Sequence, residues 1–129
     1  MSKKVMVVDD EPDILSSLKM ILEHEDYEVI TVENGIKCLK EIEKGFEGVV
    51  LMDLMMPEMD GWETIKKIRD KGFMKKVAIE IITGKGTKNH NSMSELGSYI
   101  YDYMSKPLDI RELVNSVEKC YRFLDARNN

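Results

Sequence analysis

Residues 5–12 read VMVVDDEP, a run of four apolar residues that stops at two aspartates and is followed by a proline. A short apolar run of this kind, rich in β-branched residues and bounded by charge, is typical of a strand buried on both faces of a parallel sheet. Pro12 suits the first turn of a helix, where a backbone N–H has no partner within the helix. The stretch therefore predicts a strand, an acidic corner and a helix in succession.

The same succession recurs along the rest of the chain. Strands are expected at residues 5–8, 28–32, 48–52, 77–82 and 100–105. Helices are expected from Asp13 to Glu25, from Ile36 to Gly45, from Trp62 to Gly72 and after a capping Asp109, with a turn at Asn34–Gly35. Strands that alternate with helices imply right-handed crossovers and helices on both faces of a parallel sheet. We therefore expect an α/β fold with a doubly wound five-stranded sheet in the order 2-1-3-4-5.

Two segments fit this pattern poorly. Residues 84–99 are polar and rich in glycine and asparagine where a fourth helix would lie, so we expect that helix to be short or mobile. Glu80 places a carboxylate in the middle of an expected interior strand, which is costly unless the group is paired or lies at the rim. The pattern offers no explanation for Glu80.

Composition limits the class of protein. The 129 residues suit one domain, expected over 1–129 with a core from about residue 3 to residue 125. A net charge of -5 argues against direct binding to nucleic acid, and no apolar run approaches the length of a membrane span. Cys38 and Cys120 lie at apolar positions of expected helices, without CxxC spacing, and are interpreted as reduced core residues. A cytoplasmic protein is expected.

Polar side chains stand where four of the five strands end. These are Asp9 and Asp10 after the first strand, Asp53 after the third, Thr83 after the fourth and Lys106 after the fifth. Strand ends share one edge of a parallel sheet, so three carboxylates, a hydroxyl and an ammonium converge there. Clustered carboxylates repel one another and favour a hard divalent cation such as Mg²⁺. Such a cation would screen an incoming phosphoryl group, so the set fits phosphoryl transfer to Asp53.

Four motifs in chain order carry a resemblance to a known family. They are VVDDEP (7–12), LMDLMMPEMDG (51–61), IITG (81–84) and YMSKP (103–107). Together they resemble the response-regulator receiver domain of two-component signalling over nearly the whole chain. The resemblance implies a (βα)5 flavodoxin-like fold. It implies that Asp53 is the phosphoacceptor, that Mg²⁺ binds Asp10, Asp53 and the backbone carbonyl of Met55, with Asp9 acting through water, and that Thr83 and Lys106 contact the phosphoryl group.

The resemblance also implies the parts of a switch. Gly84 is the small residue beside Thr83, Tyr103 is the aromatic switch residue, and the Lys106–Pro107 bond is expected to be cis. The partner surface is expected at the fourth helix, fifth strand and fifth helix. The segment GSYIYDY (97–103) is longer than the usual family segment, which leaves the geometry of that surface open.

The leading hypothesis is a stand-alone receiver that takes its phosphoryl group from a histidine kinase or a phosphotransfer protein. It would be no enzyme beyond self-catalysed phosphotransfer and autodephosphorylation, and either a monomer or a phosphorylation-dependent dimer. One alternative is a Mg²⁺-dependent aspartyl-phosphate phosphohydrolase, although such enzymes carry DxD after the first strand and Asp53 follows the third. Others are a receiver fragment of a longer regulator and an adaptor with a vestigial site, against which the complete set of polar residues argues.

Met55 and Lys85 are expected to tune the rate of dephosphorylation. Each lies two residues beyond a site residue, Met55 after Asp53 and Lys85 after Thr83. Methionine is only a weak acceptor for an attacking water, and a lysine can pair with phosphoryl oxygens. We therefore expect a long-lived phosphorylated form, unless Met55 merely packs against other methionines.

Overall fold

The computed structural model describes residues 3–84 and 95–128. Five strands form one sheet: β1 (Lys4–Val8), β2 (Glu28–Val32), β3 (Gly48–Asp53), β4 (Val77–Thr83) and β5 (Ile100–Ser105). The helices are α1 (Pro12–His24), α2 (Gly35–Glu43), α3 (Gly61–Asp70) and α5 (Ile110–Arg127), and a 3-10 turn, η1 (Gly97–Tyr99), precedes β5. All strand pairs are parallel and the order is β2-β1-β3-β4-β5, which confirms the predicted fold.

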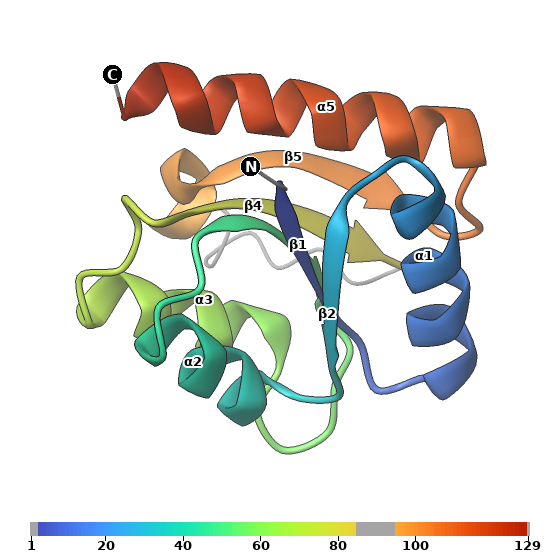
Figure 1. Cartoon of the computed structure of the whole chain (residues 1–129). Coiled ribbons are helices and arrows are strands. Elements are labelled where there is room, and N and C mark those ends of the chain that lie inside the picture. The colour runs from blue at the N-terminus through green and yellow to red at the C-terminus, as the bar shows by residue number, and fades with distance from the viewer. Residues whose placement is uncertain (1–2, 85–94, 129) are drawn as a thin grey trace.

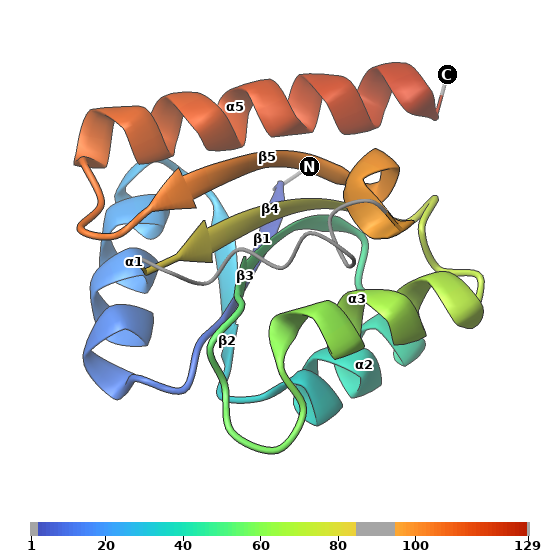
Figure 2. The same cartoon turned by 180° about the vertical axis from the view of Figure 1, so that it is seen from behind.

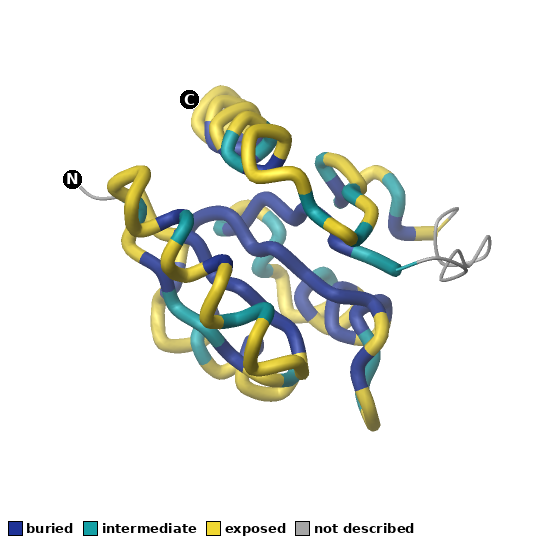
Figure 3. Tube along the Cα trace, turned by 90° about the vertical axis from the view of Figure 1, so that its right-hand side faces the viewer, coloured by how far each residue is buried: buried dark blue, intermediate teal, exposed yellow. Residues whose placement is uncertain are grey.

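Helices cover both faces of the sheet (Figure 1), with α1 and α5 on one face and α2 and α3 on the other. Alternate residues of each strand feed the two layers: Val5 and Val7 pack under α1 and α5, whereas Met6 and Val8 pack under α2 and α3. The central strands are buried along nearly their whole length (Figure 3), which explains why they are continuous apolar runs.

The predicted strands agree with the structure to within a residue. The turn predicted at Asn34–Gly35 was wrong. Asn34 caps α2 by accepting a hydrogen bond from the backbone N–H of Lys37, and Gly35 is the first helical residue. The pair Asn-Gly favours a turn only when both residues leave the helical region, and a side-chain cap is the competing use of asparagine. Cys38 and Cys120 are buried and free, as predicted.

The expected fourth helix falls largely on residues 85–94, which lie outside the described residues. Glu80 does lie inside the sheet, fully buried, and its carboxylate accepts a hydrogen bond of 2.6 Å from the hydroxyl of Ser116 on α5. Ile110, the first apolar residue of the predicted α5 stripe, is 58% exposed because it lies at the first turn, before the helix meets the sheet.

Candidate functional site

The strand order brings the carboxyl ends of β1, β3 and β4 side by side. The arrowheads of β4 and β5 point the same way, toward α1 (Figure 2). Asp9 directly follows β1, while Asp53 and Thr83 are the last residues of β3 and β4. Residues 44 positions apart in the sequence, Asp9 and Asp53, therefore share one edge of the sheet.

Asp9, Asp10 and Asp53 form an acidic cluster in which one carboxylate oxygen from each residue lies within 4.8 Å of the others. Asp9 and Asp53 are each only 2% exposed, whereas Asp10 is exposed. Oxygen ligands that are partly buried and open on one side suit a hard divalent cation that keeps some of its waters. The cluster therefore fits a Mg²⁺ site.

Lys106 places a positively charged ammonium group beside these carboxylates. Its Nζ donates a hydrogen bond of 3.0 Å to Oδ2 of Asp9 and lies 3.8 Å from Oδ2 of Asp53. Burial lowers the pKa of Lys106, but the hydrogen bond to Asp9 and the charges of Asp53, Asp9 and Glu11 outweigh burial and raise it overall. Lys106 is therefore charged and holds the two buried acids together.

The neighbours of Asp53 shift its pKa in opposite directions. Burial and the charge of Asp9 raise its pKa to about 6, while the backbone N–H of Met55 and the charge of Lys106 act in the other direction. The Met55 N–H lies 3.2 Å from Oδ1 of Asp53 and fixes the orientation of the carboxylate. The remaining oxygen, Oδ2, faces Lys106. At neutral pH the group is a carboxylate whose negative charge is only partly balanced by Lys106. Binding of a further cation beside it is therefore favourable.

Thr83 and Lys106 are joined through the backbone, since the Lys106 N–H donates a bond of 2.8 Å to the carbonyl of Thr83. The Thr83 hydroxyl donates to the carbonyl of Gly84 at 3.1 Å and is half-buried. The Lys106–Pro107 peptide bond is cis, in line with the resemblance. The hydroxyl and the ammonium therefore reach the same edge of the sheet from β4 and from the end of β5.

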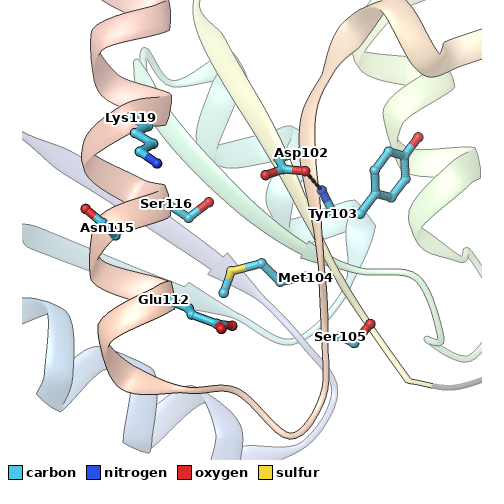
Figure 4. Close-up of a pocket in the computed structure, with 8 residues that line it drawn as sticks. All are labelled: Asp102, Tyr103, Met104, Ser105, Glu112, Asn115, Ser116 and Lys119. Carbon is cyan, nitrogen blue, oxygen red and sulfur yellow. Dashed lines mark hydrogen bonds between the residues drawn. The ribbon is translucent and has the colours of Figure 1, made fainter.

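The remaining predicted residues lie farther out. Met55 is 64% exposed and Tyr103 is 38% exposed on β5. Figure 4 shows the Tyr103 ring on the side of β5 away from α5. Lys85 lies outside the described residues, so its expected contact with the phosphoryl group stays a prediction.

Two residues that support the site received no role from the sequence. Glu11 places Oε1 3.6 Å from Nζ of Lys106, and its backbone N–H donates to Oδ1 of Asp9 at 2.9 Å. Gly61 begins α3 where the loop returns to the site: a Cβ there would lie 2.6 Å from the backbone oxygen of Asp53. Both residues stand inside quoted motifs, and that position is the signal that could have singled them out.

A model of the response regulator receiver domain family matches residues 5–118. The chain belongs to this family. Receiver domains are phosphoacceptor switches rather than classical enzymes, and they interact with histidine kinases. The protein is thus the receiver domain of a two-component response regulator.

The receiver is similar to two curated transcriptional regulators. It is 36% identical over 123 residues to the alkaline phosphatase synthesis transcriptional regulatory protein PhoP of Bacillus subtilis, covering 95% of this chain and 50% of that protein. It is 35% identical over 122 residues to the transcriptional regulatory protein SrrA of Staphylococcus aureus, covering 95% and 49%. The chain spans about half the length of these curated relatives.

Solved structures give the same fold. A CheY-like receiver domain protein from Methanospirillum hungatei is 35% identical, with a TM-score of 0.91 over 96% of this chain and 98% of that one. The response regulator TrrA from Thermotoga maritima, in complex with Mg(2+)-BeF, is 33% identical with a TM-score of 0.76 over 92% and 98%. The receiver fold therefore extends across nearly all of the chain.

Proposed function

We propose that Asp53 accepts a phosphoryl group from a histidine kinase or a phosphotransfer protein in a reaction that requires Mg²⁺. The observation that carries this proposal is the cluster of Asp9, Asp10 and Asp53 with Lys106 against it. The similarity to the TrrA structure, which holds Mg(2+)-BeF, supports the same assignment.

The residues divide the chemistry between them. An oxygen of Asp53 attacks phosphorus, a new O–P bond forms, and the bond from phosphorus to the donor nitrogen breaks as that nitrogen leaves with a proton. Asp10, Asp53 and the carbonyl of Met55 would hold Mg²⁺, with Asp9 acting through water, and the ion would neutralise charge between carboxylates and phosphoryl oxygens. Lys106 and Thr83 then bind those oxygens, and Gly84 leaves room beside them.

The same site is proposed to remove the phosphoryl group by hydrolysis, without a separate phosphatase. Water attacks phosphorus in line with the Asp53 oxygen, and the exposed side chain of Met55, two residues beyond Asp53, is proposed to affect its approach. Lys85 follows Thr83 by two residues and is proposed to pair with the phosphoryl oxygens. The receiver would thus catalyse its own phosphotransfer and autodephosphorylation.

We further propose that the chain acts as a stand-alone receiver, one domain over residues 1–129, with a protein target at the expected fourth helix, β5 and α5. The net charge of -5 supports a protein target rather than direct contact with nucleic acid. The competing arrangement is a receiver within a longer regulator, favoured by the twofold greater length of PhoP and SrrA. The mass of the native protein in cell extracts distinguishes the two.

The location of the protein also stays a prediction. Within residues 3–84 and 95–128 the structure has no helix long and apolar enough to cross a bilayer. We propose a cytoplasmic location, as the sequence predicts, and either a monomer or a dimer that forms on phosphorylation. Cell fractionation and size-exclusion chromatography with and without a phosphodonor test these two statements.

The phosphoacceptor is tested by incubating the protein with acetyl phosphate and Mg²⁺ and measuring its intact mass. We expect one added phosphoryl group, which is absent with a chelator and in Asp53→Asn. Asp60→Asn is a matched control, because Asp60 is a helix cap in the same loop and lies outside the acidic cluster. A phosphoryl group that persists in Asp53→Asn would contradict the assignment, and multiple turnovers of p-nitrophenyl phosphate would favour the phosphohydrolase.

A further inference from the structure

Glu80 is a buried acid that phosphoryl transfer does not use. It lies in the middle of β4 and is 0% exposed. The hydroxyl of Ser116 on α5 donates a hydrogen bond of 2.6 Å to its Oε2, while Oε1 has no hydrogen-bond partner among the residues that the structure describes. A buried charge with a single hydrogen bond is costly, so this setting favours the neutral form of the carboxyl group.

The hydrogen bond joins β4 to α5 inside an apolar layer. Ala78 and Ile82, on either side of Glu80 in β4, belong to this layer together with Val117 of α5, which directly follows Ser116. Apolar contacts have no preferred direction, whereas a hydrogen bond does. The bond therefore fixes one point in the middle of α5 against the sheet.

The groups that face Glu80 offer no compensating positive charge. Among the described residues, its titratable neighbours are Asp102 and Tyr101 from β5 and Cys120 from α5, and β3 presents the apolar Leu51. Asp102 stands in register with Glu80 because a β-bulge makes Tyr101 an extra residue in β5. A second acid thus lies beside the first on the neighbouring strand.

Two basic residues of this part of α5 do not neutralise Glu80. Arg127 donates to the carbonyl of Val77, and Lys119 lines an open cavity; within the described part of the chain neither forms an ion pair with Glu80. Burial raises the pKa of Glu80 to about 7; the hydrogen bond from Ser116 opposes this shift, and the charge of the neighbouring acid adds to it. Glu80 therefore loses its proton near neutral pH.

The cavity between β5 and α5, of about 430 Å³, offers a route for water. Its lining includes Ser116 but not Glu80. Figure 4 shows the Ser116 side chain directed toward β5. Because Ser116 both lines the cavity and binds Glu80, its displacement would open the buried carboxyl group to the solvent in the cavity.

We propose that Glu80 and Ser116 form a proton-dependent latch that holds the middle of α5 on the sheet. While Glu80 is protonated, the latch is closed and the carboxyl group stays dry. When Glu80 releases its proton to solvent, the new charge requires water, Ser116 separates from it, and the adjoining part of α5 opens away from β4. No other bond forms or breaks in this step.

The direction of the pH dependence follows from where each form ionises. The pKa of Glu80 is about 7 in the closed form and approaches the ordinary value of 4.5 once the group is solvated. Between these values the open form has lost a proton that the closed form still holds, so each rise in pH favours opening. The latch is therefore tightest below about pH 4.5 and weakest above about pH 7.

The two cysteines provide a readout within one molecule. Cys120 lies four residues after Ser116, buried in the same layer as Glu80's apolar neighbours, whereas Cys38 is buried on α2 in the layer on the other face. Pulse labelling of the whole unphosphorylated chain with N-ethylmaleimide, followed by peptide mass spectrometry, gives the ratio of the Cys120 rate to the Cys38 rate. The intrinsic effect of pH on thiol reactivity cancels in this ratio.

We expect the ratio of the Cys120 rate to the Cys38 rate to rise about tenfold between pH 5.5 and pH 7.5, because local opening exposes only the layer under α5. Unfolding of the whole domain would expose both thiols together. A ratio that stays constant over this interval would overturn the proposal.

Variants assign the effect to Glu80. Glu80→Gln stays neutral and keeps an acceptor for Ser116, so its ratio should not change with pH. Glu112→Gln removes a charge from the exposed lining of the cavity and should keep the tenfold rise. Asp102→Asn, at an exposed residue, should reduce the rise and serves as the test if Glu80→Gln does not fold. A full rise in Glu80→Gln or in Asp102→Asn would contradict the proposal.

Ser116→Ala tests the other half of the latch. Loss of the hydrogen bond should raise the labelling ratio at pH 5.5 about fivefold, because the closed form loses a contact that the open form does not make. A ratio at pH 5.5 equal to that of the wild type would show that Ser116 does not hold α5, and the latch would be refuted.

Asp53→Asn separates the latch from the acidic cluster, because the pKa of Asp53 is about 6 and lies in the same interval. This variant should keep the tenfold rise, since the cluster includes neither Glu80 nor Ser116. A rise that disappears in Asp53→Asn would assign the pH dependence to the cluster and exclude the latch. The labelling uses no phosphodonor, so its outcome is independent of whether Asp53 accepts a phosphoryl group.

Discussion

A neutral Glu80 is tolerated inside the sheet, whereas a charged one is disfavoured, because only one of its two oxygens has a hydrogen-bond partner among the described residues. Its pKa is about 7 in the folded state, against 4.5 for an ordinary glutamate. Between these pH values the native state holds a proton that the unfolded state releases. The free energy of unfolding contributed by Glu80 is therefore complete below about pH 4.5 and is lost as the pH rises through 7.

Glu80→Gln should remove this dependence. Glutamine stays neutral, so the variant should match the wild type near pH 4.5 and exceed its free energy of unfolding at pH 8 by about 2–3 kcal/mol. Denaturant unfolding at several pH values measures the difference, and the raised pKa of Asp53 cancels because both proteins contain it. Glu112→Gln is the exposed control. A pH-independent difference between Glu80→Gln and the wild type would show that Glu80 has the same pKa in the folded and unfolded states.

Met55 bears on how long the phosphorylated state lasts. Its backbone N–H contacts Asp53, its side chain is exposed, and a methionine sulfur orients water poorly. Met55→Asn should shorten the phosphoryl half-life about tenfold, which corresponds to about 1.4 kcal/mol of barrier. The half-life is followed by intact mass after removal of the donor, and Met20→Asn is a control at another exposed methionine. Equal half-lives would mean that Met55 does not govern the access of water.

The candidate site was predictable where it depends on strand ends alone. Asp9, Asp53 and Thr83 lie at one edge of the sheet because parallel strands end there, and a sequence shows where strands end. Gly61 depends instead on how closely a loop returns to the backbone of Asp53. The partner of Glu80, Ser116, is 36 residues away on a helix whose position over the sheet no local pattern determines.

At the scale of elements, three helices end in the same hydrogen-bond pattern but with different residues. After α1, the N–H of Tyr27 binds the carbonyl of Leu22, and Asp26 has a φ of 69°. The corresponding residues after α2 and α3 are Gly45 and Gly72. Glycine adopts a positive φ without the steric cost that a side chain imposes, so Asp26 is the strained member of the three.

Asp26→Gly should therefore stabilise the protein by about 1 kcal/mol. The opposite change, Gly72→Ala, should destabilise it by a similar amount, since nothing within 4 Å obstructs a Cβ there and only the backbone angle of 79° is unfavourable. Thermal and denaturant unfolding of both variants test the pair. A less stable Asp26→Gly would mean that the Asp26 side chain makes a compensating interaction.

The element boundaries show which local signals were sufficient. Gly45 and Gly72 were predicted to end helices and do so, because the αL position that follows a helix selects glycine. Asp26 occupies the same αL position after α1, but an aspartate does not indicate a helix end as a glycine does. Asn34 was assigned to a turn because capping and turn formation use the same side-chain acceptor, and only the helix that follows distinguishes them.

At the scale of the whole molecule, β5 connects the candidate site to the proposed partner surface. Lys106 follows its last residue and reaches Asp9 and Asp53, while Tyr103 lies three residues earlier, in register with Ile81 of β4. If phosphorylation of Asp53 draws Thr83 and Lys106 toward the phosphoryl group, the space beside β4 changes and the Tyr103 ring can move from its exposed position. One charge event would then bias two arrangements of the same surface.

Tyr103→Ala should leave phosphorylation of Asp53 nearly normal but reduce the gain in partner affinity that phosphorylation produces, a coupling typically of about 1–3 kcal/mol. The measurement compares the affinity for a downstream partner with and without acetyl phosphate. Tyr101→Ala is the matched control, because Tyr101 is an aromatic residue of the same strand whose ring packs 5.3 Å from Phe123 of α5 instead. If Tyr103→Ala retains the full gain in partner affinity, the Tyr103 ring is not the switch, because the coupling then does not need the ring.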